Sequence, residues 1–407
     1  MPATALRCRN CAAEHELDAV GACPSCFGPL EPVYDAARVR SLTRECIAAG
    51  PPSIWRYADL LPVDPPRDAR LAPGLTPLVW APRLAEAVGV GELWLKLDTA
   101  NPTHSFKDRV VAVAAQKALE LGFTTIACSS TGNLANAVAA RAAAEGIEAA
   151  VFCPADLEPE KLRATAVYGA TIYAVRGTYD DCSRLTVELS FELPWAFVNV
   201  GLRSYYAEGS KTVAFEIAEQ LGWELPDAVV CPIASGSLFT KIGTGFAQLA
   251  EAGLVGEQTP RLYGGQAAGC APVAAAFREK RRVAPIRRPE TVARSLAIGN
   301  PADGDFAVAA ARASGGAIEA VAEPAIGENM ELLAATAGVF GETAAGVTLG
   351  ALRAAVGRGE VGAADRVVLV VTGDGLKTPD AVEHTLRPLE IEPDADVVLD
   401  ELGVAVD

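Results

Sequence analysis

Lys107 is the residue of this sequence best suited to chemistry. It lies in the stretch NPTHSFKDR (101–109), directly before an alanine- and valine-rich run that is typical of a helix. A helix N-terminus carries partial positive charge, which disfavours a lysine there by roughly 0.3–1 kcal/mol. The same field and removal from water lower the pKa of an amine from its usual value of about 10.4. Lys107 is therefore either a solvated lysine tolerated at this cost or an amine that readily loses its proton to react with a carbonyl group.

A second polar loop, CSSTGNLAN (128–136), follows one predicted strand and opens the next predicted helix. Its hydroxyls, its glycine and the first N–H groups of the helix suit a bound carboxylate. Its asparagine adds a side chain that both donates and accepts hydrogen bonds. An ordinary Ser/Thr helix cap would use the same residue types. We expect a substrate carboxylate to be held by Ser130, Thr131, Gly132 and Asn133.

A third loop, PIASGSLFTKIGTG (232–245), repeats the arrangement of strand, small residues and helix. Small side chains expose successive backbone N–H groups, which form a nest for a phosphate. The loop has neither the G-K-[ST] of a P-loop nor a dinucleotide fingerprint, so ATP and NAD are poor candidates. The predicted phosphate nest consists of Ala234, Ser235, Gly236, Ser237 and Leu238.

Together these loops favour one cofactor. Pyridoxal 5′-phosphate needs a lysine, a nest for its phosphate, a partner for its ring nitrogen and a hold on the carboxylate of its amino-acid substrate. The stretch VVTGDGLKTPD (371–380) places Thr372 at the end of a predicted strand, where its hydroxyl is available to the ring nitrogen. We therefore predict a pyridoxal-phosphate enzyme, with Lys107 as the cofactor lysine.

The N-terminal residues predict a separate metal site. Two C-x-x-C pairs, separated by eleven residues, can place four thiolates around Zn²⁺. A segment this short cannot bury a core, so a metal would supply its folding free energy. Four sulfurs complete the coordination shell, so the predicted zinc is structural and His15 is expected to be exposed. The predicted ligands are Cys8, Cys11, Cys23 and Cys26.

Composition restricts the possible partners. Half of the 407 residues are hydrophobic and the formal net charge is −16, which is typical of a globular protein and argues against a nucleic-acid partner. The basic run REKRRVAPIRR (278–288) is read as a solvated loop. We expect no membrane association, because the apolar runs are strand-length. The expected location is the cytoplasm, where cysteines stay reduced.

Strand-length and helix-length stretches alternate through most of the chain, which predicts parallel βαβ units and an α/β fold class. Ligands in such sheets bind beyond the carboxyl ends of the strands, where the polar loops lie. The expected helices are 109–122 and 134–146. The expected strands are 92–98, 124–130, 148–154, 170–177, 195–200, 228–234, 260–267 and 366–375.

The motifs resemble the fold-type II pyridoxal-phosphate enzymes and, among them, the threonine synthase family. The resemblance covers about residues 70–380 in the family's order. The matching segments are GLTPLVWAPRL (74–84), NPTHSFKDR (101–109), SSTGNLANA (129–137), AEGSKTVAFEI (207–217), SLAIGNP (295–301) and TGDGLK (372–377).

The resemblance implies two parallel-sheet αβα domains and a homodimer. It implies a larger cofactor-binding domain and a smaller mobile domain that closes to exclude water, with a zinc-ribbon-like segment at the N-terminus. The implied ranges are 1–35 for the ribbon, 36–99 and 206–390 for the large domain, 100–205 for the small domain and 391–407 for an acidic tail.

The implied reaction converts O-phospho-L-homoserine and water to L-threonine and phosphate. By similarity Lys107 binds the cofactor and moves protons among the substrate's carbons, Asn133 contacts the cofactor's 3′-oxygen, and the nest holds its phosphate. Thr372 would meet the pyridine nitrogen as a neutral hydroxyl, which gives a weaker electron sink than a carboxylate partner.

The chain departs from the family pattern where the substrate's tail would bind. Leu134 stands where a threonine is usual, Val200 where a serine is usual, and Tyr206 near the position of the usual arginine. Arg203 and Lys211 are the expected replacements that pair with a phosphate.

The alternatives are threonine or serine dehydration and a cysteate synthase-like β-replacement. A further alternative is a zinc ribbon that binds proteins on a silent α/β body, but such a body would not be expected to keep the lysine and the nest.

Overall fold

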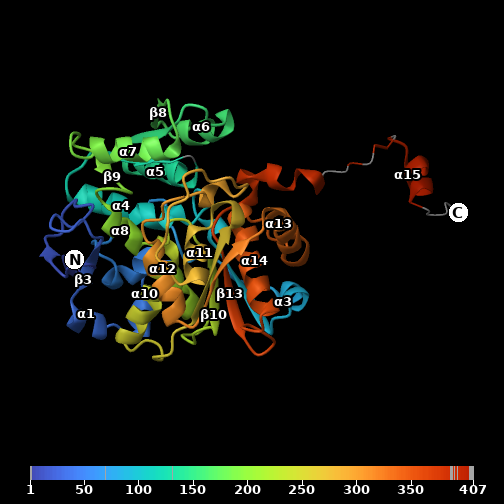
Figure 1. The fold of residues 1–407 in the computed structure, drawn as a ribbon, viewed down its shortest axis with the longest axis horizontal. Coiled ribbons are helices and arrows are strands. Elements are labelled where there is room, and N and C mark those ends of the chain that lie inside the picture. The colour runs from blue at the N-terminus through green and yellow to red at the C-terminus, as the bar shows by residue number, and fades with distance from the viewer. Residues whose placement is uncertain are drawn as a thin grey trace.

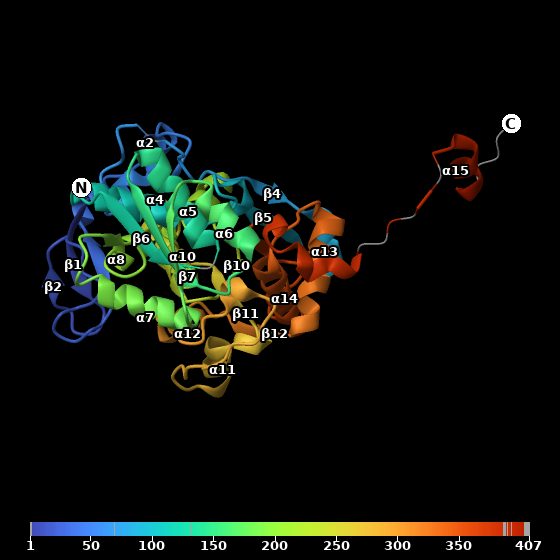
Figure 2. The same ribbon diagram turned by 90° about the horizontal axis from the view of Figure 1, so that it is seen from above.

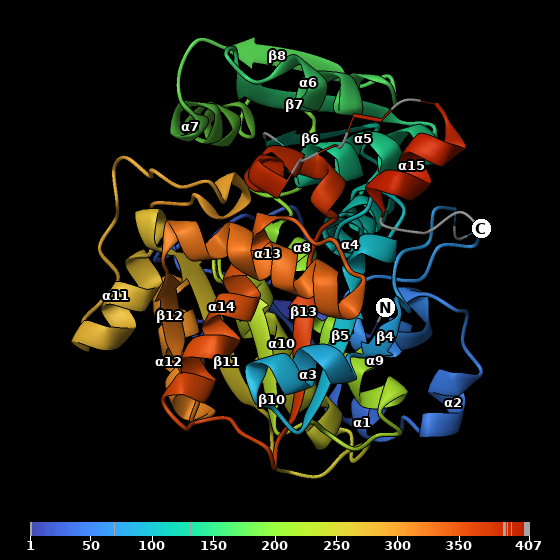
Figure 3. The same cartoon turned by 90° about the vertical axis from the view of Figure 1, so that its right-hand side faces the viewer.

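Two parallel β-sheets of different size, each covered by helices, make up most of the computed structural model (Figure 1). The structure describes residues 2–68, 70–130, 132–385, 388, 390–391 and 393–402. Figure 3 shows the four-stranded sheet above the six-stranded one. The predicted α/β fold class is confirmed.

The large sheet has the strand order β12-β11-β10-β13-β5-β4, and its strands run parallel except for the edge strand β4. Alternate residues of β13 face opposite layers, Val368 and Val370 on one side and Val367 and Leu369 on the other. Both faces are therefore apolar, as expected for a buried parallel sheet. The strands are β4 Leu78–Trp80, β5 Glu92–Leu97, β10 Ala228–Pro232, β11 Arg261–Ala267, β12 Ile318–Val321 and β13 Arg366–Val371.

Helices cover the large sheet on both faces. One face packs against α3 Pro82–Val88, α13 Glu323–Ala337 and α14 Thr343–Gly357. The other packs against α9 Lys211–Gln220, α10 Ser237–Glu251, α11 Pro272–Glu279 and α12 Gly304–Ala313. Short 3-10 helices connect these elements, namely η1 Ile54–Leu60, η2 Asp98–Ala100, η3 Ala268–Cys270, η4 Arg294–Leu296, η5 Gly375–Lys377 and η6 Pro379–Thr385.

The small sheet is parallel, with the order β8-β7-β6-β9. Ile126 and Cys128 pack toward α4 and α5, and Ala127 between them packs toward α7. Its strands are β6 Thr125–Ser129, β7 Glu148–Pro154, β8 Thr171–Val175 and β9 Ala196–Phe197. Its helices are α4 Lys107–Glu120, α5 Asn133–Glu145, α6 Pro159–Ala166 and α7 Tyr179–Leu189.

The N-terminal segment forms a three-stranded antiparallel sheet that packs beside helix α8 (Figure 2). Leu6 and Leu30 of this sheet share one apolar core with Leu202 and Tyr205. The sequence analysis did not predict these strands. The elements are β1 Ala3–Cys8, β2 Glu14–His15, β3 Leu30–Tyr34, α1 Ala36–Arg40, α2 Arg44–Ala48 and α8 Arg203–Glu208.

The strands of each sheet fall inside the ranges expected for the large and small domains, whose limits stay a prediction. The edge strands β4 and β12 were not predicted, because strands of three or four residues carry little periodicity. In the tail range 391–407, α15 Ala395–Glu401 lies apart from both sheets (Figure 1). Within the described part of the chain, no helix is both long and apolar enough to cross a membrane.

A buried ionic cluster fixes the start of α4. Arg109 donates to Asp98 at 2.7 Å and to Glu216 at 2.8 Å, and Lys96 lies 2.6 Å from Glu216. These four side chains are fully buried and carry balanced charges. Burial by itself raises the pKa of Glu216, but Arg109 and Lys96 lower it to about 2. The cluster therefore ties α4 to β5 and α9.

Glu216→Gln is expected to lower the free energy of unfolding by roughly 3–5 kcal/mol, because it leaves buried cations without their partner. The measurement is urea denaturation at neutral pH, with the exposed Glu257→Gln as the control. The stabilisation by Glu216 is present above its ordinary pKa of 4.5 and is lost as the pH falls toward 2. The difference in the free energy of unfolding between wild type and variant should therefore become smaller at acidic pH. A difference that does not change with pH would contradict stabilisation by the ionised Glu216.

Candidate active site

The loop that carries Lys107 is joined to the end of β13. Phe106 N donates to Thr372 O at 2.9 Å, and Asp374 N donates to His104 O at 3.2 Å. His104 has a φ of 59°, in the left-handed region that glycine adopts without strain. His104 therefore holds a backbone conformation that is strained for a residue with a side chain. Helix α4 begins at Lys107, two residues earlier than predicted, so the lysine occupies its first turn.

Lys107 is half-buried beside aromatic rings. Its Nζ donates to Tyr206 Oη at 3.1 Å and lies 4.6 Å from the centre of the Phe106 ring. Burial lowers the pKa of Lys107 below its ordinary value, against the opposing effects of Tyr179 and Glu342. The predicted direction of the pKa shift is thus found, and desolvation is its main cause. An amine in this setting loses its proton more readily than a solvated lysine.

Three neighbouring strands bring the predicted loops to one edge of the large sheet. The order β10-β13-β5 places the carboxyl ends of these strands next to each other. The nest follows β10, Thr372 follows β13, and the Lys107 loop follows β5. Thr372 is buried. The parallel arrangement of the sheet therefore assembles the groups that the sequence analysis selected.

The predicted nest has the conformation expected of an anion site. Gly236 has a φ of 94°, and a Cβ there would lie 2.8 Å from Asp303 O. Asp303 N donates to Ser235 O at 2.9 Å. The Leu238 side chain belongs to the apolar core, so only its backbone N–H can face a ligand. The first backbone hydrogen bond of α10 is donated by Thr240 N to Gly236 O. The Leu238 N–H lies before that point, among the helix N-terminal N–H groups that have no partner within a helix.

Asn133, at the first position of α5, belongs to a polar network. Its Nδ2 donates to both Glu342 oxygens at 3.1 Å, and its Oδ1 accepts from Lys377 Nζ at 2.7 Å. Lys377 also donates to Thr103 O at 2.5 Å, next to the lysine loop. Burial raises the pKa of Glu342, opposed by Lys377. The network sets the orientation of the Asn133 amide.

The other residues of the predicted carboxylate loop differ in role. Ser130 Oγ accepts from Gly132 N at 3.2 Å and from Ala135 N at 3.1 Å, so it caps α5. A Cβ on Gly132 would meet no atom within 4 Å, so there is open space beside its Cα. Thr131 lies outside the described residues. Carboxylate binding by this loop stays a prediction.

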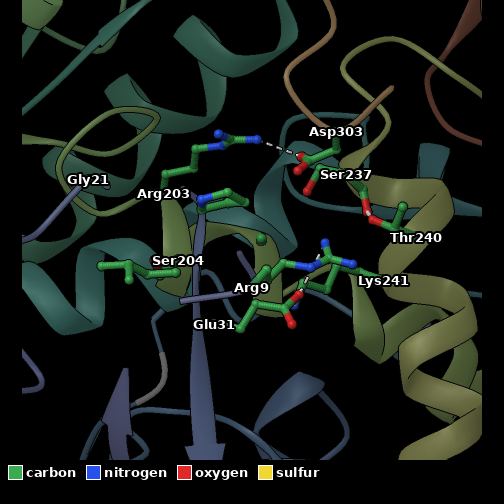
Figure 4. A pocket seen from close by; sticks show the side chains of 12 residues that line it. Arg9, Gly21, Glu31, Arg203, Ser204, Ser237, Thr240, Lys241 and Asp303 are labelled. Carbon is green, nitrogen blue, oxygen red and sulfur yellow. Dashed lines mark hydrogen bonds and ion pairs between the residues drawn. The ribbon is translucent and has the colours of Figure 1, made fainter. Parts of the chain in front are cut away.

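Arg203 and Lys211 are engaged elsewhere. Arg203 donates to Asp303 at 2.7 Å beside Ser237, as Figure 4 shows. Lys211 is buried, 2.5 Å from Glu208, and donates to Gln248 at 2.7 Å. Both cations are therefore already paired with carboxylates of the protein itself. A substrate role for either stays a prediction that this geometry does not favour.

The four predicted zinc ligands lie together, with their Sγ atoms within 4.8 Å of one another. The Gly28 N–H favours the Cys26 thiolate, but the Cys8 and Cys11 thiols raise the pKa of Cys26 to about 12. Four thiols this close together form a donor set that fits a zinc ion. His15 was expected to be exposed, but its Nε2 lies 3.4 Å from Cys23 Sγ.

The sequence analysis assigned no role to Glu342, Lys377 or Tyr179, although all three interact with predicted site residues. Lys377 lies inside the TGDGLK segment, where its motif was a usable signal. Glu342 directly precedes α14 and Tyr179 begins α7, outside every motif of the sequence analysis, so the sequence offered no signal for them.

Known proteins match this chain over most of its length. A family model described as pyridoxal-phosphate dependent enzyme matches residues 69–373. The threonine synthase of Methanocaldococcus jannaschii is 34% identical over 397 residues, 96% of this chain and 98% of the relative. That of Methanosarcina acetivorans is 36% identical over 384 residues, 93% of each chain. The chain belongs to the threonine synthase family of pyridoxal-phosphate-dependent enzymes.

Solved structures support the same fold-type II architecture for this member of the threonine synthase family. Diaminopropionate ammonia lyase from Escherichia coli superposes with a TM-score of 0.65 at 17% identity, covering 86% of this chain and 92% of that one. Threonine deaminase isoform 2 from Solanum lycopersicum gives 0.63 at 21% identity, with coverages of 76% and 82%. At these identities the likeness concerns the fold alone.

The residues of the threonine synthase family site fit pyridoxal phosphate. The lysine has a lowered pKa, the nest presents backbone N–H groups, and a buried threonine follows the central strand. Among the described residues, Ser105 Oγ and Thr343 Oγ1 are buried without a hydrogen-bond partner. Ser105 lies two residues before Lys107, and Thr343 follows Glu342. Buried polar atoms of this kind are expected beside a site that holds a polar ligand.

Proposed function

We propose that the protein is a lyase that converts O-phospho-L-homoserine and water to L-threonine and phosphate. The observation that carries the proposal is a desolvated Lys107 at the junction of three strand ends, in a chain 34–38% identical to threonine synthases. A lysine with a lowered pKa gives up its proton more readily than a solvated lysine, and this reaction requires protons to be moved among several carbons.

The cofactor, when bound, supplies an electron sink for negative charge that develops on the substrate's carbons. Lys107 attaches the cofactor and, once released, carries protons at its Nζ between those carbons. The N–H groups of 234–238 would hold the cofactor phosphate, Asn133 would be the partner of the ring's 3′-oxygen, and Thr372 would be the partner of the ring nitrogen. The hydroxyl of Thr372 leaves that nitrogen without a full countercharge.

The small domain, proposed as 100–205, excludes water from the site. Glu158, at the start of α6, forms an ion pair with Arg294 of η4. This contact joins α6, beside the small sheet, to η4, which belongs to the large-sheet part of the chain. Closure of this kind protects charge-delocalised species from premature hydrolysis.

A second candidate is elimination from unphosphorylated threonine or serine, or a β-replacement of the cysteate synthase kind. The observation in its favour is that Arg203 and Lys211 are paired with Asp303 and Glu208, and that Tyr206 stands near the position of the family's usual arginine. A phosphorylated substrate needs cations opposite the cofactor, whereas threonine does not.

The cofactor-loaded protein is expected to release phosphate and threonine in equal amounts from O-phospho-L-homoserine. Lys107→Ala is expected to abolish both, because the attachment point and the proton carrier are lost. Phosphate and threonine are quantified together, with the exposed Lys280→Ala as the matched control. A protein that binds the cofactor but instead makes ammonia and a 2-oxo acid from threonine would contradict the proposal and favour the second candidate.

We further propose a structural zinc ion held by Cys8, Cys11, Cys23 and Cys26. The support is the mutual proximity of the four thiols in a segment with little core of its own. The ribbon packs on α8, where Tyr205 Oη donates to Asp18 O at 3.2 Å.

Purified protein is expected to contain one zinc ion per chain. The zinc content is measured by elemental mass spectrometry. Cys11→Ser is expected to lose the metal and to lower the midpoint of thermal unfolding, since three thiolates hold zinc poorly. Cys46→Ser, at an exposed cysteine outside the cluster, is the control. Full zinc content in Cys11→Ser would disprove the assigned ligand set.

A homodimer in the cytoplasm completes the proposal. The edge strand β4 exposes Val79 and Trp80, and apolar residues on an edge strand favour an interface. None of the ten cysteines, all of which lie in the described part of the chain, forms a disulfide, which agrees with a reducing compartment. Sedimentation velocity is expected to give twice the mass of the chain. A single species with the mass of one chain would exclude the dimer.

A further inference from the structure

Tyr206 touches the reacting atom of the proposed site. Its Oη accepts a hydrogen bond from Lys107 Nζ at 3.1 Å, and the ammonium lies 5.7 Å from the centre of its ring. The two residues belong to different helices, α8 and α4, and lie 99 positions apart in the chain. None of the roles derived above uses this hydroxyl.

The backbone around Tyr206 is built for close approach to α4. A Cβ on Gly209, just after α8, would lie 2.6 Å from Arg109 O, so only glycine allows the two helices this distance. Arg109 is in turn fixed by the buried ionic cluster. The Tyr206 hydroxyl is therefore held against the first turn of α4, where Lys107 lies.

Both ends of α8 are anchored. At its start, Arg203 pairs with Asp303, which also supports the nest through Ser235 (Figure 4). At its end, Glu208 lies 2.5 Å from Lys211 and 2.7 Å from Lys241. Tyr206 thus sits in a short helix that cannot shift without breaking a partly exposed ion pair at its start and buried ion pairs at its end.

Four titratable groups face Lys107 from different elements. They are Tyr206 of α8, Tyr179 of α7, Cys128 of β6 and Glu342 at the start of α14. Burial raises the pKa of each of these groups, so the tyrosines and the thiol stay neutral at physiological pH. Tyr206 is the one with a direct hydrogen bond to Nζ among the described residues.

We propose that Tyr206 is a further catalytic residue, whose hydroxyl holds and orients the Lys107 amine whenever that amine is free of the cofactor. The inference rests on the proposed function, because it assigns Lys107 the role of proton carrier. When Lys107 takes a proton from the substrate, its ammonium donates one N–H to Tyr206 Oη. The tyrosine keeps its own proton, and no bond breaks at its oxygen. The contact stabilises the charged amine in the orientation from which it returns the proton.

Tyr206→Phe is expected to lower the pKa of the Lys107 amine by about one unit, since a hydrogen bond that favours the charged form is lost. The full-length chain is freed of cofactor with hydroxylamine and acetylated over a series of pH values, and modification of Lys107 is quantified by peptide mass spectrometry. The midpoint of acetylation should move to lower pH in the variant. This readout needs no substrate, so it holds whether or not O-phospho-L-homoserine is turned over.

The adjacent Tyr205→Phe is the matched control. Tyr205 lies in the same helix and is fully buried, but its hydroxyl bonds Asp18 O of the ribbon. This variant should keep the wild-type midpoint. In steady state, Tyr206→Phe should lower kcat about tenfold and leave KM within about twofold, because the contact acts on the lysine and not on the substrate. Thermal unfolding of both variants checks that they fold.

Coincident acetylation midpoints for wild type and Tyr206→Phe would overturn the proposal. Equal shifts in Tyr205→Phe and Tyr206→Phe would also overturn it, because they would reveal a general loosening of α8. The wild type could fail to form threonine while Tyr206→Phe still shifts the acetylation midpoint. That result would support the contact between Tyr206 and Lys107 and would contradict O-phospho-L-homoserine as the substrate.

Discussion

The buried ionic cluster around Arg109 is the constraint on which the rest of the site depends. Arg109 lies two residues after Lys107 in the first turn of α4, and its carboxylate partners come from η2, directly after β5, and from α9. Such a cluster contributes little net stability relative to apolar packing, but breaking it is costly because charges are left unpaired in a medium of low polarity. Its effect is positional. It fixes the helix that presents the lysine relative to the sheet that presents the nest and Thr372.

Around this cluster, the parallel sheet brings the site loops together and burial shifts the pKa values of their side chains. The neighbouring ends of β10, β13 and β5 bring three distant loops to one edge. Burial at that edge lowers the pKa of Lys107 and raises that of Glu342, which moves both groups toward their neutral forms. Neutral groups with fixed orientation suit proton transfer in a site from which water is excluded. The N-terminal sheet contributes by packing on α8, the helix that faces the lysine.

Much of the site could be predicted because its backbone signals are local. The lysine before a helix and the small residues of 234–238 follow directly from short stretches, and the neighbouring strand ends bring them to one edge of the large sheet. Side-chain pairing was less predictable. Arg203 bonds a residue 100 positions away and Lys211 one 37 positions away, so a cation that looks free in sequence is already paired in space.

By itself the sequence determined the fold class and the cofactor that the polar loops are suited to bind. Alternating strand and helix patterns require parallel βαβ units, and the residue types of the loops after those strands select the cofactor. Only the tertiary structure decided which polar groups face Lys107. Tyr206 contacts Lys107 from a helix 99 positions away, Glu342 acts on its charge from the start of α14, and Asn133 accepts a hydrogen bond from Lys377. The physical reason is that hydrogen bonding and desolvation depend on distances in space, which residue spacing along the chain does not encode.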